Sequence, residues 1–104
     1  MNEFDGPTLK QLSLLLLVSR TQSLGAAARK LGVTQSAVSH AARDLERRCG
    51  FEIFDRGVYN TYVSREGMTV ATQARRVLDE YERLLDMIAK IAQRLARAER
   101  RLNP

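Results

Sequence analysis

The segment from Ser23 to Gly50 constrains the fold of this chain more than any other stretch. Two short amphipathic helical patterns meet there at the turn Gly32-Val33-Thr34. At about 100° per residue, the second pattern separates into two faces. One face is apolar, with Val38, Ala41, Ala42 and Leu45, and the other is polar and basic, with Gln35, Ser36, Ser39, His40, Arg43 and Arg47. The apolar face must pack against a core, whereas the polar face is free to meet a partner.

Capping residues and small side chains define the geometry of this segment. Thr34 can accept a hydrogen bond from an unpaired N–H at the start of the second helix, and Gly32 suits the left-handed residue that ends the first. Ala27 and Ala28 are small enough for the following helix to cross closely. These features predict a helix-turn-helix, whose second helix enters the major groove of DNA.

The composition agrees with an anionic partner. The 104 residues contain 17 lysines and arginines against 12 acidic residues, which gives a net charge of +5. Such a balance favours nucleic acid over a membrane surface. The length allows one domain and leaves no room for a second, ligand-binding domain. No apolar run approaches the roughly 18 to 20 residues of a membrane span, and the N-terminus does not resemble a signal peptide, so we expect a cytoplasmic protein.

The sequence offers little for catalysis or for metal binding. One cysteine and one histidine are too few for an all-protein zinc site or an internal disulfide. The chain also lacks a Gly-rich phosphate loop, a Ser/His/Asp arrangement and paired carboxylates in a plausible pocket. We therefore expect no enzyme activity, no metal and no cofactor. Cys49 is more typical of a small buried hydrophobic residue than of a redox sensor.

Start and stop signals predict three short helices, over about 9–21, 24–31 and 35–49, with Thr8, Ser23 and Thr34 as their N-caps. The first helix is expected to bury Leu9, Leu12, Leu16 and part of the leucine run.

We expect the short apolar run over 51–54 to pack across the core as a strand or an extended segment, and a hairpin to follow it. We expect its strands at Val58, Tyr59, Tyr62 and Val63, and its turn at Asn60-Thr61. This hairpin is the wing of a winged helix-turn-helix.

A long helix is predicted from about Ser64 to Leu102, because no proline interrupts it and a heptad seam runs along it. The seam comprises Val70, Ala74, Val77, Tyr81, Leu84, Ile88, Ile91, Leu95, Ala98 and Leu102. A helix of about 36 residues is about 54 Å long, and nothing else in the chain can cover such a stripe. A long amphipathic helix can instead pack on its own domain, but this seam continues well past the reach of the small core.

The seam therefore predicts a homodimer, with Val77, Tyr81, Leu84, Ile88, Ile91 and Leu95 at its interface. The expected fold is mainly α, with a winged helix-turn-helix DNA-binding domain over 1–64 and a dimerising linker helix over 65–102. The basic residues beyond Leu95 form a solvated face or a supplementary phosphate contact.

Several pieces of the chain together resemble the N-terminal DNA-binding domain of the LysR-type transcriptional regulators. They are Ser23-Leu24, Ala26-Ala27-Ala28, Leu31-Gly32-Val33, Gln35-Ser36-Ala37-Val38-Ser39, Leu45-Glu46, Gly50, Phe54, Arg56 and Val63-Ser64-Arg65-Glu66-Gly67. The resemblance implies a winged helix-turn-helix and a linker helix that pairs antiparallel with its copy. Such dimers bind interrupted palindromes in double-stranded DNA and activate or repress transcription.

The resemblance also places base reading on Gln35, Ser36, Ser39 and His40. Glutamine can pair with adenine through two hydrogen bonds, and serine can bond a base edge or a phosphate. The candidate DNA-binding set is completed by Thr34, Arg43, Arg47, Arg56 and Tyr59, of which the arginines fit phosphate contacts.

Three positions depart from the family pattern. His40 stands where an arginine is common, Ala41 where a polar residue is common, and Tyr59 where an arginine usually reaches the minor groove. Base reading therefore moves toward Gln35, Ser36 and Ser39.

Family members ordinarily continue into an effector-binding domain, whereas this sequence stops after the long helix. We favour a complete small protein, a dimeric sequence-specific regulator without its own effector domain. Two alternatives stay open. The chain could be an antagonist that forms heterodimers with other regulators through the long helix, or an architectural protein that coats DNA with little specificity.

Overall fold

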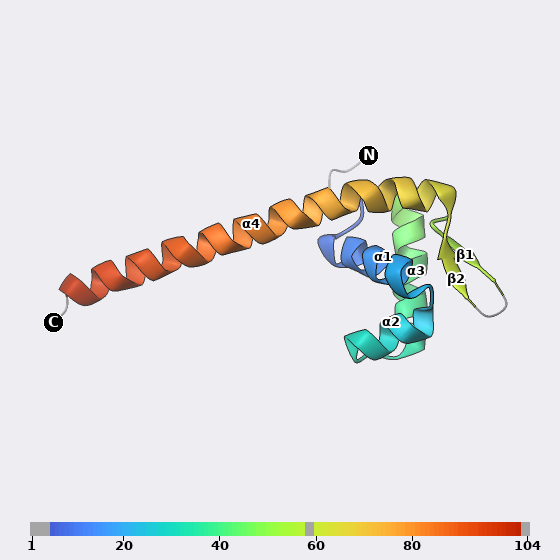
Figure 1. Ribbon diagram of the computed structural model, residues 1–104, viewed down its shortest axis with the longest axis horizontal. Helices are drawn as coiled ribbons and strands as arrows, with labels where there is room; N and C mark the ends of the chain where they lie inside the picture. The colour runs from blue at the N-terminus through green and yellow to red at the C-terminus, as the bar shows by residue number, and fades with distance from the viewer. Residues whose placement is uncertain (1–4, 58–59, 103–104) are drawn as a thin grey trace.

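The computed structural model describes residues 5–57 and 60–102. They form α1 (Leu9–Thr21), α2 (Leu24–Leu31), α3 (Gln35–Cys49), β1 (Phe54–Arg56), β2 (Thr61–Val63) and α4 (Arg65–Leu102). Helices α1 to α3 gather against one end of α4, beside the hairpin, and the rest of α4 extends away from them (Figure 1). This confirms the predicted mainly α fold, a winged helix-turn-helix followed by a long helix.

Each of the first three helices begins at a side-chain cap. The hydroxyl of Thr8 accepts a hydrogen bond from the N–H of Gln11, whose side chain accepts one from the N–H of Thr8. Ser23 and Thr34 accept in the same way from the third residue of α2 and α3. The predicted starts of all three helices are therefore confirmed.

Left-handed residues end the same three helices. Gly32 and Gly50 follow α2 and α3 with φ of 68° and 87°, a region that glycine enters without steric cost. Gln22 ends α1 with φ of 54°, and its N–H donates to the carbonyl of Val18 at 2.7 Å. The predicted ends at Thr21, Leu31 and Cys49 are confirmed.

The core lies where α1, α2, α3, the hairpin and the start of α4 converge. Its members are Leu14, Leu15, Val18, Leu24, Ala27, Ala28, Val38, Ala42, Leu45, Ile53, Phe54 and Ala71. Of the three leucines expected to be buried in α1, Leu12 is buried, whereas Leu9 and Leu16 are only half-buried. The reason is that α1 is rotated about its axis so that Leu14, Leu15 and Val18 face the core.

The hairpin differs from its prediction at the turn. β1 and β2 are antiparallel, with Arg56 opposite Thr61. Thr61 thus begins a strand rather than completing a turn, and its N–H donates to the carbonyl of Gln22 at 3.1 Å. This bond joins the strand to the end of α1, and Thr61 is buried where β2 packs against α1. The expected strand positions Val58 and Tyr59 lie outside the described residues.

Gly67 lets the first turn of α4 pack closely on the strap that precedes β1. A Cβ at this position would overlap the carbonyl oxygen of Ile53 and would lie 2.7 Å from a methyl of Val63. Ser64 caps the helix by accepting from the N–H of Gly67 at 3.0 Å, and its hydroxyl donates to the carbonyl of Glu52.

The heptad seam divides into two parts. Val70 is half-buried and Ala74 is buried, because the first turns of α4 cover α1. From Val77 onward the seam is exposed, with exposed fractions between 39% at Tyr81 and 59% at Leu95 among the six predicted interface residues. The two first seam positions therefore belong to the core of their own chain. Among the described helices, none combines the length and hydropathy that a membrane span requires.

Candidate nucleic-acid interface

The polar face of α3 lies opposite the core. Val38, Ala42 and Leu45 are buried, which fixes the rotation of the helix about its axis. Five of the predicted contact residues are consequently exposed along one side, and a sixth is half-buried. The exposed ones are Gln35, Ser36, His40, Arg43 and Arg47, and the half-buried one is Ser39. The structure thus brings the six predicted α3 residues together on one outward face.

The first turn of α3 lies close to α2, where Gly25 provides room for two long side chains. A Cβ at residue 25 would lie 3.2 Å from Oε1 of Gln35 and 3.6 Å from Nη1 of Arg29. Arg29 therefore shares the edge of the polar face with Gln35. It was not among the predicted site residues, although its spacing one turn after Gly25 could have indicated it.

Thr34 is exposed, but its hydroxyl oxygen already accepts from the N–H of Ala37 at 3.1 Å. Its role in the free chain is to cap α3, as predicted from the sequence. The hydroxyl hydrogen is not used by this bond, so a donor remains available there.

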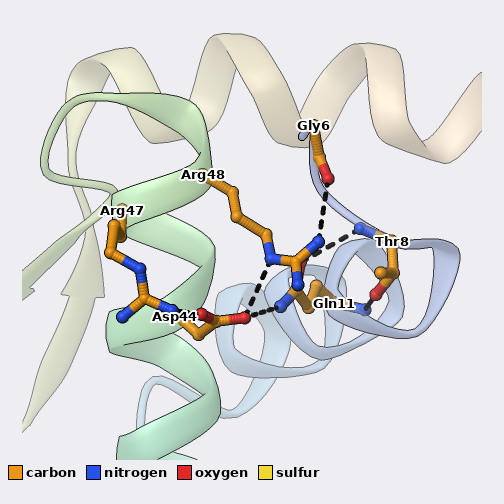
Figure 2. Close-up of polar contacts among 6 residues, drawn as sticks. All are labelled: Gly6, Thr8, Gln11, Asp44, Arg47 and Arg48. Atoms are coloured by element: carbon orange, nitrogen blue, oxygen red, sulfur yellow. Dashed lines mark hydrogen bonds and ion pairs between the residues drawn. The ribbon is translucent and has the colours of Figure 1, made fainter. Parts of the chain in front are cut away.

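Arg47 is engaged by a carboxylate that sequence reasoning did not single out. Its guanidinium forms an ion pair with Asp44, one turn earlier in α3. Asp44 also accepts from Nε2 of Gln11 at 2.6 Å and from Nε of Arg48 at 3.0 Å (Figure 2). Gln11 and Asp44 are 33 residues apart, so no local sequence pattern could have indicated this contact.

Arg56 is the last residue of β1, at the turn end of the hairpin, and its side chain is held by Glu46 of α3. Its Nη2 lies 3.2 Å from Oε1 of Glu46, and its guanidinium carbon is 6.0 Å from the centre of the Phe54 ring. This position leaves the side chain 37% exposed, so a phosphate contact would use the N–H groups that Glu46 does not occupy. The other wing candidate, Tyr59, lies outside the described residues.

A shallow apolar groove lies where α1 begins beside α4. It is lined by Leu9, Val77, Glu80, Tyr81, Arg83, Leu84 and Met87. The exposed seam residues Ile88, Ile91 and Leu95 continue from it along α4. The predicted interface residues are therefore contiguous and accessible.

The remaining candidates for chemistry are clustered ligand side chains and the thiol of Cys49. Across residues 5–57 and 60–102, no group of three or more His, Cys, Asp or Glu side chains could hold a metal ion. Cys49 is half-buried, and burial, assisted by the negative charge of Glu46, raises the pKa of its thiol above the ordinary value. A raised pKa disfavours the reactive thiolate.

Known proteins resemble this chain in sequence and structure. Residues 9–68 match the family model described as bacterial regulatory helix-turn-helix protein, lysR family. The HTH-type transcriptional regulator MetR of Salmonella typhimurium is 38% identical over 77 residues, which cover 74% of this chain and 24% of MetR. The uncharacterized regulator YfeR of Shigella flexneri is 32% identical over 89 residues, which cover 86% of this chain and 29% of YfeR. The chain thus spans less than a third of the length of these two relatives.

Two solved structures that contain DNA show the same architecture. Vibrio fischeri DarR in complex with DNA has a TM-score of 0.79 and 27% identity, over 89% of this chain and 30% of DarR. The BenM DNA-binding domain in complex with catB site 1 DNA has a TM-score of 0.77 and 26% identity, over 84% of this chain and 94% of that one. The family match covers the helix-turn-helix, the hairpin and the start of α4, and the chain therefore belongs to the LysR family of bacterial regulatory helix-turn-helix proteins.

Proposed function

We propose that this chain acts as a homodimeric transcriptional regulator that reads double-stranded DNA with α3 and dimerises through α4. Membership of the LysR family supports DNA binding and transcriptional regulation. The observation that carries the proposal is the outward face of α3, where six polar or basic side chains lie opposite three buried apolar ones. In a helix-turn-helix this is the face that enters the major groove.

The side chains on this face divide by chemistry into base readers and phosphate binders. Gln35, Ser36, Ser39 and His40 carry hydrogen-bonding groups that suit base edges, and glutamine can bond the N6 and N7 atoms of adenine together. Arg43 and Arg47 suit phosphates, which fix the register of the protein on the duplex without reading sequence. In this proposal the sugar-phosphate backbone of DNA is also contacted at the edges of the interface by Thr34, Arg56 and Tyr59. The net charge of +5 strengthens the attraction of the whole chain to DNA.

The exposed stripe on α4 supports a dimer. Large apolar side chains stay 39% to 59% exposed from Val77 to Leu95 in the single chain. An apolar stripe of this length is costly in water and is characteristic of a protein interface. The heptad spacing is what a second helix needs for knobs-into-holes packing, so we assign the stripe to a second copy of this chain. Residues 1–64 would then bind DNA, and residues 65–102 would dimerise.

The charges along α4 favour an antiparallel pair. Residues 79–86 carry four acidic side chains and one arginine, whereas residues 90–101 carry five basic side chains and one glutamate. Packed helices lie about 8 to 10 Å apart, which is comparable to the screening length of about 8 Å at physiological salt. An antiparallel pair sets the acidic half of one helix beside the basic half of the other, and a parallel pair sets like charges together.

Selection of bound fragments from a random duplex library tests the function as a whole. We expect enrichment of one interrupted palindrome, because a two-fold dimer presents two copies of α3. Salt-sensitive binding without enrichment would instead support the architectural alternative. Absence of DNA binding, together with exchange into heterodimers with another LysR-family regulator, would support the antagonist alternative.

A further inference from the structure

An acidic side chain, Asp44, lies on α3 between the polar face of that helix and the start of α1. Asp44 lies in the middle of α3 and pairs with Arg47, whose side chain is 75% exposed (Figure 2). We propose that Asp44 is a positioning residue that weakens the contact of Arg47 with DNA phosphates, and thereby lowers affinity for DNA of arbitrary sequence. The proposal rests on the DNA-binding role proposed above for α3.

Asp44 is anchored by contacts that do not depend on Arg47. Gln11 donates to it at 2.6 Å, and the other amide atom of Gln11 accepts from the N–H of Thr8 at 3.0 Å. Arg48 donates to it at 3.0 Å and also to the carbonyl of Gly6 at 3.3 Å. Only 19% of the Asp44 side chain is exposed. The Asp44 carboxylate is therefore fixed in place by contacts at the start of α1, whereas Arg47 lies on the surface.

This arrangement makes a phosphate compete with a fixed carboxylate for the guanidinium of Arg47. An arginine that neutralises a phosphate releases the counterions condensed on it, but an arginine held by a carboxylate must first give up that ion pair. Arg43 is exposed on the same face, and no ion pair of Arg43 is seen in the described part of the chain. The two arginines should consequently contribute unequally to binding that does not depend on sequence.

Removal of the Asp44 charge tests this directly. The probe is a random-sequence duplex, titrated by fluorescence anisotropy between 50 and 200 mM salt with D44N, R47A and the double variant. D86N is the matched control, since Asp86 also pairs with a basic side chain, Lys90, at 2.9 Å but lies on the exposed far part of α4. D86N changes the net charge by the same amount without touching the α3 face. Because Asp86 belongs to the acidic half of α4, sedimentation velocity must show that the D86N protein is as dimeric as wild type before the two are compared.

We expect D44N to bind the random duplex more tightly than wild type and D86N. The salt slope is the slope of log affinity against log salt concentration, and each additional phosphate contact steepens it by about 0.9. Across a fourfold change in salt, one additional contact therefore costs about 3.5-fold more affinity. The R47A substitution should cost more affinity in the D44N background than in wild type. D44E, which keeps the charge, should retain the wild-type slope. A D44N slope equal to that of D86N, or an R47A cost that is the same in both backgrounds, would overturn the proposal.

Circular dichroism shows whether the D44N protein is folded. If it is not, a comparison of R43A with R47A still tests the proposal. In the otherwise unchanged chain, R43A should reduce the salt slope more than R47A does. Equal reductions would mean that Asp44 does not restrain Arg47. If the wild-type protein fails to bind any duplex, the proposed function itself is wrong; if wild type binds and only these differences are absent, the role of Asp44 alone is wrong.

Discussion

Glu46 and Arg56 form an ion pair, with Oε1 and Nη2 3.2 Å apart, that joins α3 to the last residue of β1. The second carboxylate oxygen of Glu46 accepts hydrogen bonds from the N–H groups of Ile53 at 2.9 Å and Phe54 at 3.2 Å. One side chain of α3 therefore binds both the strap and the first strand. The position of the wing relative to α3 depends on this carboxylate.

The Glu46→Gln substitution should reduce the free energy of unfolding by about 1 to 3 kcal/mol, because the partly buried N–H groups and Arg56 lose a charged acceptor. Urea denaturation followed by circular dichroism measures the change. Glu82→Gln on the exposed part of α4 is the control and should shift stability by less than about 0.5 kcal/mol. Equal stability of the two variants would show that the Glu46 contacts contribute nothing.

Substitution of Gly67 by alanine should destabilise the chain by about 1 to 3 kcal/mol, the usual cost of overpacking. The added methyl would overlap the carbonyl of Ile53 and crowd Val63, so the start of α4 must shift. Gly6→Ala is the matched control, since a Cβ there meets nothing within 4 Å. Thermal melts of the two variants should differ clearly; identical melting temperatures would contradict the close packing.

The helix bounds could be predicted from the sequence because their signals are local. Thr8, Ser23 and Thr34 each bond an N–H three residues later, and Gly32 and Gly50 occupy the left-handed region that ends a helix. The polar face of α3 was predictable for a similar reason, since burial of its apolar side fixes which residues face outward.

The remaining features depend on contacts between distant segments. Thr61 was expected in a turn, but it pairs with Arg56 in the hairpin and its N–H donates to the carbonyl of Gln22 in another segment. The roles of Asp44 and Glu46 likewise arise from partners on other elements, namely Gln11 and the strap with β1. Hydrophobic periodicity carries no information about such pairs. The i,i+3 spacing of Asp44 and Arg47 is local and can be read from the sequence, whereas the anchoring of Asp44 by Gln11 and the pairing of Arg56 with Glu46 depend on the folded structure.

The Cys49 thiol should react slowly with iodoacetamide at neutral pH. Burial and the nearby charge of Glu46 raise its pKa, so the thiolate fraction is smaller than in a free cysteine and appears only at higher pH. Alkylation rates measured against pH should therefore reach their midpoint above that of the urea-unfolded chain. Cys49→Ser should bind DNA like wild type before and after peroxide treatment; loss of a peroxide response in this variant would instead identify a sensor.

An aspartate in place of Ile88 should disrupt the proposed dimer. Ile88 is 51% exposed in the single chain and lies in the middle of the α4 stripe, so a dimer would bury the new charge without a partner. We expect the dissociation constant of the dimer to rise at least about a hundredfold, which corresponds to roughly 2.7 kcal/mol. Sedimentation velocity measures the change.

Ala89→Asp supplies the control for this experiment, because residue 89 is turned about 100° away from its neighbour on the helix. The control variant should remain dimeric. Two variants that dissociate equally, or an Ile88→Asp protein that stays dimeric, would remove the stripe from the interface.

The central claim, that α3 reads base sequence, is tested most directly by the affinities of Gln35→Ala and Arg43→Ala for the selected palindrome and for a scrambled duplex. Gln35→Ala should lose about 1 to 3 kcal/mol on the palindrome and almost nothing on the scrambled duplex, because base contacts specify sequence. Arg43→Ala should weaken both duplexes alike and make the salt slope shallower by about 0.9. Equal losses on the two duplexes for Gln35→Ala would contradict base reading by α3.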